Sequence, residues 1–318
     1  MNTIEEPILR RSPLVSVIMN CRNCDKYLKE AVESVLKQSY QNWEVIFWDN
    51  QSTDNSAIVF EAYKDSRLRY HLAPEFTPLG EARNLAMKKA KGEFIAFLDC
   101  DDIWLPRKLE KQIPVFDREN IGLVICDTIF FNDKRNIRQI YKKKKPPVGK
   151  VFKELLASYF VSLETTIIRT SVLYKLDHWF DTRFDVIEEY DFFVRIGYEF
   201  EVGYVDEVLS KWRVHSASWT WSRPELFPAE TELFVEKMKR SIPNFHEDFA
   251  EEIQTLEIKI AIQRSIIAWR DGKTSLARKT LAPFMFKNIF ATLIVVWSFL
   301  LPYETFDFIN KVRVGLRE

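Results

Sequence analysis

The strongest constraint on the fold is an alternation of short apolar segments with amphipathic segments over the first hundred residues. The apolar segments are short and rich in β-branched or aromatic side chains, which is typical of buried strands; they lie at residues 14–20, 43–49, 68–73 and 93–99. The segments between them carry apolar residues at helical spacing, at 25–39, 52–64 and 78–92. This alternation predicts an α/β fold with a mostly parallel central sheet flanked by helices.

Acidic side chains follow the second and the fourth of these predicted strands. Asp49 ends residues 43–49 and Asp54 lies just beyond it, whereas Asp99, Asp101 and Asp102 end the fourth apolar segment. Ligands of such sheets bind beyond the carboxyl ends of the strands, so these acids are expected on one rim. Alternate residues leaving a strand point the same way, and Mg²⁺ prefers carboxylate oxygens together with substrate phosphates. The rim therefore has side chains that suit a divalent metal ion, although an acidic D-x-D spacing is also common in solvated loops.

The second half of the chain is less regular. We expect strands at 122–131, where a hairpin follows, at 162–169 and within 205–220, and an amphipathic helix at 186–200. The basic segment 141–150 is interpreted as a solvated loop, with phosphate or lipid-headgroup binding as the alternative. From residue 224 onward the pattern is helical, with a long amphipathic helix at 250–272. We therefore predict two parts, an α/β domain at 1–222 and a C-terminal helical region at 223–318.

Residues 289–302 form an apolar run that only Thr292 and Ser298 interrupt. The run is shorter than the roughly 20 residues that a bilayer span requires. Two interpretations stay open: a helix buried in the protein, or a helix that lies in or on a membrane face.

Charge and composition exclude several classes of partner and function. Lys and Arg together number 46, and so do Asp and Glu, so no net field attracts nucleic acid. The four cysteines form no disulfide framework, the Cys21–Cys24 pair is interpreted as part of a turn, and residues 1–13 lack the apolar core of a signal peptide. The turn after the first predicted strand, "NCRNCD", has no glycine, which argues against a Rossmann oxidoreductase or a phosphate-loop phosphotransferase. A cytoplasmic protein is expected.

Several motifs in order carry a resemblance to a known family. The segments "LVSVIMNCRNCDKYLKEAVESVLKQSYQNWEVIFWDNQSTDNS", "GEARNLAMKKAKGEFIAFLDCDDIWLPRKLEKQ" and "EEYDFFVRI" are similar to the inverting nucleotide-sugar glycosyltransferases of family 2, which have the GT-A fold. The resemblance covers about residues 13–220. It implies transfer of a sugar from a nucleotide diphosphate, with UDP-sugars the expected donors, to a hydroxyl of a glycan or lipid-linked acceptor. The "QxxRW" pattern of processive synthases is absent, so a single addition is expected.

The resemblance also implies roles for individual residues. Asp49 matches the acid that reads the uracil base, although Asn50 and Gln51 depart from the family's "DDGSTD" pattern. Asp101 matches the acid that binds Mn²⁺ or Mg²⁺, and Asp102 is expected to support it. The expected donor-binding set is Asn20, Asp49, Ser52, Asp54, Arg83 and Asp99. Arg83 suits this set because a guanidinium fits a diphosphate well.

The catalytic base is expected on the segment Glu188-Glu189-Tyr190-Asp191. Glu189 stands where the family has an aspartate and is one methylene longer, while Glu188 and Asp191 share the other helix face and are the alternatives. The "KWRVHSAS" segment places His215 as a further contact to the metal, and Trp212 and Trp219 as acceptor or loop contacts.

Two further expectations depend on the acid at the base position and on the C-terminal helices. The glutamate at the base position keeps a rival hypothesis open, a nucleotide-sugar-binding module without transfer activity. The C-terminal helices are expected to allow peripheral contact with the inner face of the cytoplasmic membrane.

Overall fold

The computed structural model describes residues 12–133, 135–215 and 223–313. The chain divides into two compact units, the first formed by Met1–Phe152 with Phe160–Arg213, and the second by Lys153–Tyr159 with Val214–Glu318. The division at residues 222 and 223 that the sequence suggested stays a prediction.

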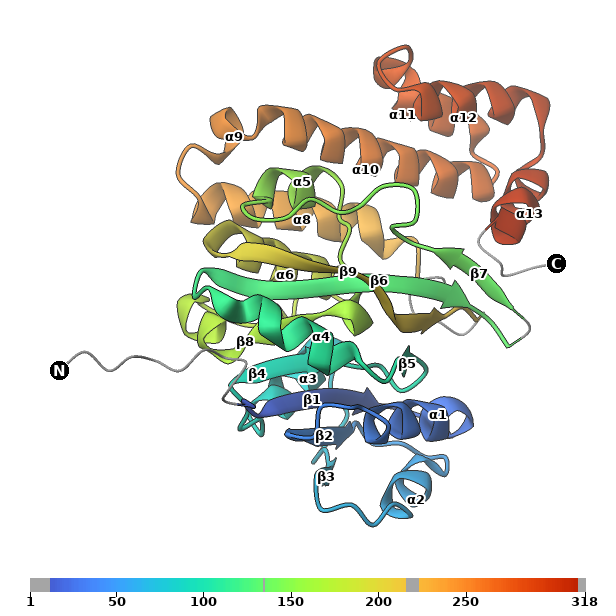
Figure 1. Cartoon of the computed structure of the whole chain (residues 1–318). Helices are drawn as coiled ribbons and strands as arrows, with labels where there is room; N and C mark the ends of the chain where they lie inside the picture. The colour runs from blue at the N-terminus through green and yellow to red at the C-terminus, as the bar shows by residue number, and fades with distance from the viewer. Residues whose placement is uncertain (1–11, 134, 216–222, 314–318) are drawn as a thin grey trace. The chain divides into compact units, whose positions relative to one another are not determined.

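The first half of the nine-stranded sheet of the first unit is parallel, as predicted (Figure 1). Its strands are β1 (Val15–Cys21), β2 (Trp43–Asp49), β3 (Leu68–Leu72) and β4 (Phe94–Phe97), in the order β3-β2-β1-β4. Three helices alternate with them: α1 (Asp25–Leu36), α2 (Ser56–Glu61) and α3 (Leu79–Met87). All seven residues of β2 are buried, as expected for a parallel strand that helices cover on both faces.

The second half of the sheet mixes directions. The strand β8 (Ile167–Arg169) pairs antiparallel with β4 and with β6 (Ile121–Phe131). The long strand β9 (Glu201–Arg213) runs parallel to β6, and its far edge carries the short antiparallel strand β5 (Ile103–Trp104). The predicted hairpin forms between β6 and β7 (Asn136–Gln139). The helices of this half are α4 (Lys108–Gln112) and α6 (Glu188–Glu199), whereas α5 (Phe152–Ala157) belongs, apart from Phe152, to the second unit. The α/β fold class is confirmed.

The second predicted helix is shorter than its apolar pattern suggested. We expected a helix over residues 52–64, but α2 begins at Ser56. The Ser52 amide donates to Asp49 Oδ1 (2.8 Å), and the Ser56 amide donates to Asp54 Oδ1 (3.0 Å). Ser and Asp side chains that bond nearby amides compete with helix formation, so the preceding residues form a loop at the end of β2.

The second unit is helical. Its elements are α8 (Leu226–Ser241), α9 (Phe245–Asp248), α10 (Ala250–Arg270), α11 (Thr274–Leu281), α12 (Ile289–Leu300) and α13 (Tyr303–Arg313). Residues of α10 to α13 build one apolar core, which includes Trp269, Leu281, Ile294 and Phe306. Among the described helices, none combines the length and the apolar character that crossing a bilayer requires.

Candidate functional site

The sheet register brings the acidic rim together. Strand β1 lies between β2 and β4: Cys21 is the register partner of Asp49, and Ile18 is the partner of Phe97. The chain after β4 turns within two residues, because the Asp102 amide donates to the Asp99 carbonyl (3.1 Å). Asp49 and the Asp99–Asp102 turn therefore leave neighbouring regions of one sheet edge, as the strand pattern predicted.

Arg83 is the centre of the site. Its side chain, on α3, is 1% exposed, and its guanidinium pairs with three carboxylates. Nη1 lies 2.8 Å from Glu188 Oε1, while Nη2 lies 3.0 Å from Glu189 Oε1 and 3.4 Å from Asp99 Oδ1. Burial alone would lower the pKa of Arg83, but the three carboxylates raise it, so the arginine stays charged.

The turn after β4 has the geometry of a cation site. Asp99, Asp101 and Asp102 each offer a carboxylate oxygen, and these three oxygens lie within 4.8 Å of one another. Burial raises the pKa of Asp99, and Asp101 adds to this while Arg83 opposes it. Burial also holds the pKa of Asp102 well above its usual value, with Asp101 contributing. Three oxygens this close suit a hard divalent cation, whose charge would relieve their repulsion.

Arg213, at the end of β9, holds this turn in place, and the sequence reasoning did not single it out. Its backbone amide donates to Asp102 Oδ1 (2.8 Å), and its Nε donates to the Asp101 carbonyl (2.9 Å). The guanidinium also pairs with Asp133 (2.6 Å) and Glu30 (3.0 Å), although its own side chain is 3% exposed. The available signal was its place in the "KWRVHSAS" motif, where only the neighbouring residues were considered.

Glu189 has the electrostatic environment of a general base. Its carboxyl group, at the start of α6, is 28% exposed and faces Arg83. Burial is the largest cause that raises its pKa, to about 8, and Glu188 and Asp99 add to the shift while Arg83 opposes it. Glu188 is almost fully buried, with its Oε1 on Arg83. The structure thus gathers both glutamates around one guanidinium.

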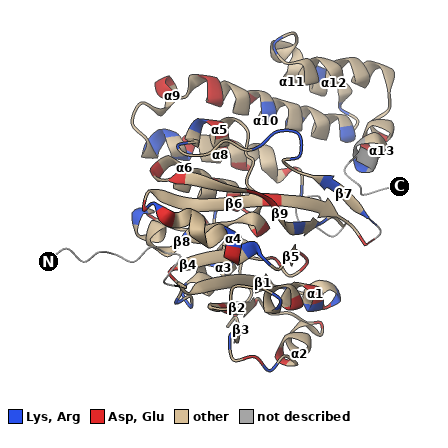
Figure 2. Ribbon diagram, viewed as in Figure 1, with Lys and Arg blue, Asp and Glu red and all other residues tan. Residues whose placement is uncertain are grey.

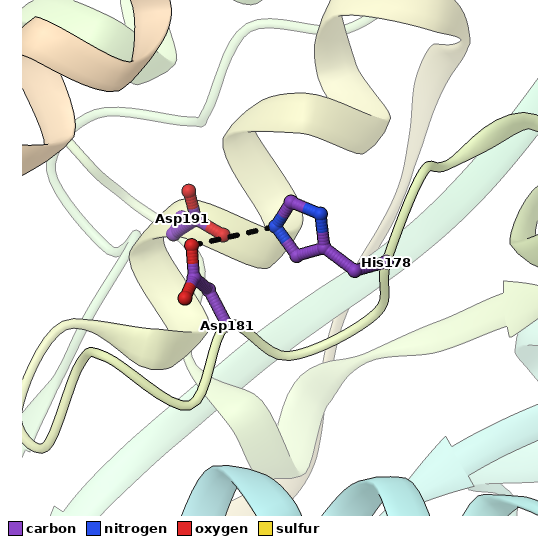
Figure 3. A group of neighbouring side chains, drawn as sticks. All are labelled: His178, Asp181 and Asp191. Carbon is purple, nitrogen blue, oxygen red and sulfur yellow. Dashed lines mark ion pairs between the residues drawn. The ribbon is translucent and has the colours of Figure 1, made fainter.

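Asp191 lies in a different cluster, which Figure 3 shows with His178 and Asp181. Its side chain is fully buried and accepts from Arg195 Nε (3.0 Å) and Nη2 (2.7 Å). Asp181 accepts from Arg183 through both of its oxygens, and His178 Nε2 lies 3.4 Å from Asp181 Oδ2 (Figure 3). Both carboxylates thus already have arginine partners. Asp191 pairs with Arg195, not with Arg83. The role of Asp191 as the base stays a prediction, and the geometry supports it less than it supports Glu189.

The expected donor-binding residues Asp49 and Ser52 already form hydrogen bonds with nearby protein groups. Asp49 is 1% exposed; Oδ1 accepts from the Ser52 amide and Oδ2 from the Tyr70 hydroxyl, both at 2.8 Å. A base N–H would therefore have to share these oxygens, so the uracil contact of Asp49 stays a prediction. The Ser52 hydroxyl accepts from the Asn23 amide (3.1 Å), which ties this loop to the one after β1.

Asp54 and Asn20 stand on the same rim. Asp54 accepts from the amides of Asp25 (2.9 Å) and Ser56 (3.0 Å) at the starts of α1 and α2. Burial would raise its pKa, but the hydrogen bonds, including one from the Ser56 hydroxyl, hold the pKa below its usual value. Asn20 Nδ2 is buried and has no hydrogen-bond partner among the described residues. A donor group that accepts a hydrogen bond would satisfy it.

The residues expected on the closing loop are only partly described. Trp212, on β9, packs edge-to-face on Phe130 with ring centroids 4.3 Å apart. His215 follows β9 and belongs to the second unit. Trp219 lies outside the described residues. The roles of all three stay predictions.

Comparisons with known proteins show the family and the fold. The family model "Glycosyl transferase family 2" matches residues 16–177, just over half of the chain. The chain is 34% identical over 156 residues to the UDP-Glc:alpha-D-GlcNAc-diphosphoundecaprenol beta-1,3-glucosyltransferase WfgD of Escherichia coli; the match covers 49% of this chain and 62% of that relative.

Two solved structures share the fold. TarS of S. aureus, solved in complex with UDP-GlcNAc, superposes with a TM-score of 0.65 at 20% identity, over 95% of this chain and 92% of that one. The mannosyltransferase PcManGT from Pyrobaculum calidifontis, solved with GDP-Man and Mn²⁺, superposes with a TM-score of 0.64 at 18% identity, over 99% and 89%. The fold is therefore GT-A, and the chain belongs to glycosyl transferase family 2.

Proposed function

We propose that the chain is a divalent-metal-dependent inverting glycosyltransferase that adds a single sugar from a UDP-sugar to a hydroxyl of a glycan or lipid-linked acceptor. One observation carries the proposal: buried Arg83 joins Asp99, from the carboxylate turn, to Glu189, from α6. This contact supports the proposal, because the acids expected to bind metal and diphosphate and the expected base would then share one charged partner. The glucosyltransferase WfgD, whose name gives UDP-Glc as donor and a diphosphoundecaprenol lipid as acceptor, supports the donor and acceptor classes.

The residues of the site divide the reaction between them. Glu189 as a carboxylate takes the proton of the acceptor hydroxyl, whose oxygen attacks the anomeric carbon of the sugar. The nucleotide diphosphate leaves from the opposite face, and Arg83 stabilises the charge that develops on it. Asp101, with Asp99 and Asp102, would hold Mn²⁺ or Mg²⁺, which as a Lewis acid would add to this stabilisation. A base with a raised pKa is suited to accept a proton near neutral pH.

The test is release of nucleotide diphosphate from a panel of nucleotide sugars with Mn²⁺ or Mg²⁺, with and without acceptors. Glu189→Gln is expected to lower acceptor-dependent turnover by roughly a hundredfold or more while donor binding persists. The matched control is Glu199→Gln, an exposed glutamate at the end of the same helix. If the wild-type chain binds nucleotide sugars but releases no diphosphate with any acceptor, the chain is the inactive binding module instead.

A lipid-linked acceptor would place the reaction at the inner face of the cytoplasmic membrane. The chain would then be a cytoplasmic protein with peripheral membrane contact. Fractionation of cells expressing the full chain tests this, since a peripheral protein leaves the membrane fraction in high salt or at alkaline pH.

A further inference from the structure

Helix α12 is apolar on both of its faces. Its inner face, with Ala291, Ile294, Val295 and Ser298, is buried, and the first three belong to the core shared with α10, α11 and α13. Its outer face carries Ile289, Leu293, Val296 and Leu300, which are 81%, 38%, 42% and 71% exposed. The sequence left open whether this segment is buried or faces a membrane, and the structure gives it one buried face and one exposed face.

The outer residues form one continuous stripe. Their spacings of four, three and four positions put Ile289, Leu293, Val296 and Leu300 on one line along the helix. We call these four residues the α12 stripe. Phe290 and Phe299 flank it at 36% and 66% exposure, and Phe286 precedes it at 90%. Because the inner face already supplies the core, the stripe adds nothing to packing within the unit, and a contiguous exposed apolar surface indicates a partner.

The chain segment that contains the stripe carries basic side chains, and the nearest acids along the chain are Asp271 and Glu304. Residues 273–303 contain Lys273, Arg278, Lys279 and Lys287 and no acidic residue. Figure 2 shows α12 without charged residues and α11 carrying basic ones. Arg278 is held beside the flank of the stripe: its Nε donates to Ser298 Oγ (3.1 Å), and its guanidinium lies 3.5 Å from the centroid of the Phe299 ring.

We propose that the α12 stripe docks the chain on the surface of an anionic lipid bilayer, with the helix lying parallel to the membrane plane. A helix of 12 residues is about 18 Å long, against a hydrocarbon core of about 30 Å, so it would lie in the interface and not cross it. Apolar side chains would enter the acyl boundary while Lys279 and Lys287, both exposed, meet anionic headgroups.

The charges favour a bilayer over a second copy of this chain. A two-fold dimer through the stripe would bring the same cationic segment of each copy together with no acid in either, which costs free energy. An anionic bilayer offers both an apolar interior and the opposite charge. The proposal rests on the proposed function only for the idea that the acceptor is itself a membrane lipid.

The test is flotation of the full chain with vesicles of phosphatidylcholine, with or without phosphatidylglycerol. We expect binding to the anionic vesicles that weakens as salt rises. The variant Ile289→Ser/Leu293→Ser/Leu300→Ser should lower the partition coefficient by roughly tenfold or more. The matched control, Ile58→Ser/Tyr174→Ser, removes apolar residues that are 69% and 84% exposed in the first unit and should bind like the wild type.

A charge variant keeps the test independent of any folding defect in the stripe variant. Lys279→Gln/Lys287→Gln should weaken binding to anionic vesicles by roughly fivefold for each cation and leave the weak binding to neutral vesicles unchanged. Equal flotation of wild type and stripe variant would overturn the proposal. So would a wild-type dimer, seen by analytical ultracentrifugation without vesicle binding, that the stripe variant dissociates.

Turnover separates this proposal from the proposed function. Diphosphate release with a soluble acceptor, but no flotation of the wild type, would overturn the docking surface and leave the transferase function standing. Flotation without diphosphate release for any nucleotide sugar would overturn the transferase function and leave the docking surface standing.

Discussion

Arg83 Nη2 lies 3.0 Å from Glu189 Oε1, so a buried guanidinium and the proposed base form one charged unit. The same nitrogen lies 3.4 Å from Asp99 Oδ1, and the other terminal nitrogen lies 2.8 Å from Glu188 Oε1. One side chain therefore connects the turn after β4 to the start of α6.

Replacing Arg83 should affect both stability and catalysis. Arg83→Met leaves three neighbouring carboxylates without their counter-ion, which should lower the free energy of unfolding by about 3 kcal/mol. Arg83→Lys restores a charge but not the fork that reaches three partners, so it should recover stability in part and turnover hardly at all. Urea unfolding and diphosphate release measure the two effects. Wild-type turnover in Arg83→Lys would show that the fork is not needed.

The raised pKa of Glu189 predicts an ascending acid limb in the pH profile, with its midpoint near the raised pKa. For the free enzyme, kcat/KM should rise with pH and level off above about 8, the pKa to which burial raises this carboxyl group. The measurement is kcat/KM against pH at fixed ionic strength. A profile that is flat between pH 6 and 9 (roughly the range that brackets this pKa) would remove Glu189 as the titrating base.

The same shift has a consequence for stability with the opposite sign. Folded Glu189 holds its proton up to about pH 8, whereas an unfolded glutamate releases it near 4.5, so between these values the folded state binds more protons. The contribution of this group to stability is therefore fully present below about pH 4.5 and is lost as the pH rises toward 8. Glu189→Gln should flatten this part of the dependence of the urea midpoint on pH. An unchanged dependence in the variant would contradict the shift.

Asp101 and Asp102 should separate metal binding from stability. Asp101→Asn removes a cation ligand and should abolish Mn²⁺ binding, measured by calorimetry, without moving the melting temperature appreciably. Asp102→Ala removes the acceptor of the buried Arg213 amide, so it should cost about 1–3 kcal/mol of stability. Unchanged Mn²⁺ affinity in Asp101→Asn would overturn the metal assignment.

Asp54 should prove to be chiefly a structural residue. Asp54→Ala leaves the amides of Asp25 and Ser56 without their acceptor at two helix starts and should cost about 1–2 kcal/mol. The pKa of Asp54 is lowered in the folded state, so its contribution to stability is present above its usual pKa and is lost as the pH falls through the folded value. The free energy of unfolding of the variant should therefore fall less steeply at acid pH than that of the wild type. A donor KM that rises at least tenfold in the conservative Asp54→Asn variant would instead support the donor contact.

Much of the fold could be predicted because its signals are local. The four apolar segments up to Asp99 became β1 to β4, and their parallel order follows from the helices between them. The second half was harder, because β8 and β9 pair with strands that lie far away in the chain. The pairing of distant strands depends on contacts between segments far apart in the chain, and the spacing of apolar residues within one segment does not predict it.

The site was predictable residue by residue but not as a network. The motif resemblance indicated Arg83, Glu189 and the acids after β4, yet nothing in their spacing says that one guanidinium contacts Glu188, Glu189 and Asp99 together. Arg213 was passed over because its role depends on an approach across 111 positions of the chain to Asp102.

The sequence by itself determined the family, the α/β class and the chemistry available at the carboxyl ends of the strands, because these depend on residue types at short spacing. The tertiary structure decided which carboxylates lie close together, which face of α12 is buried and which acids face Arg83. Those outcomes depend on burial and on distances of a few ångströms between segments that are far apart in the chain. Burial then sets the pKa of Glu189, a property that no isolated glutamate has.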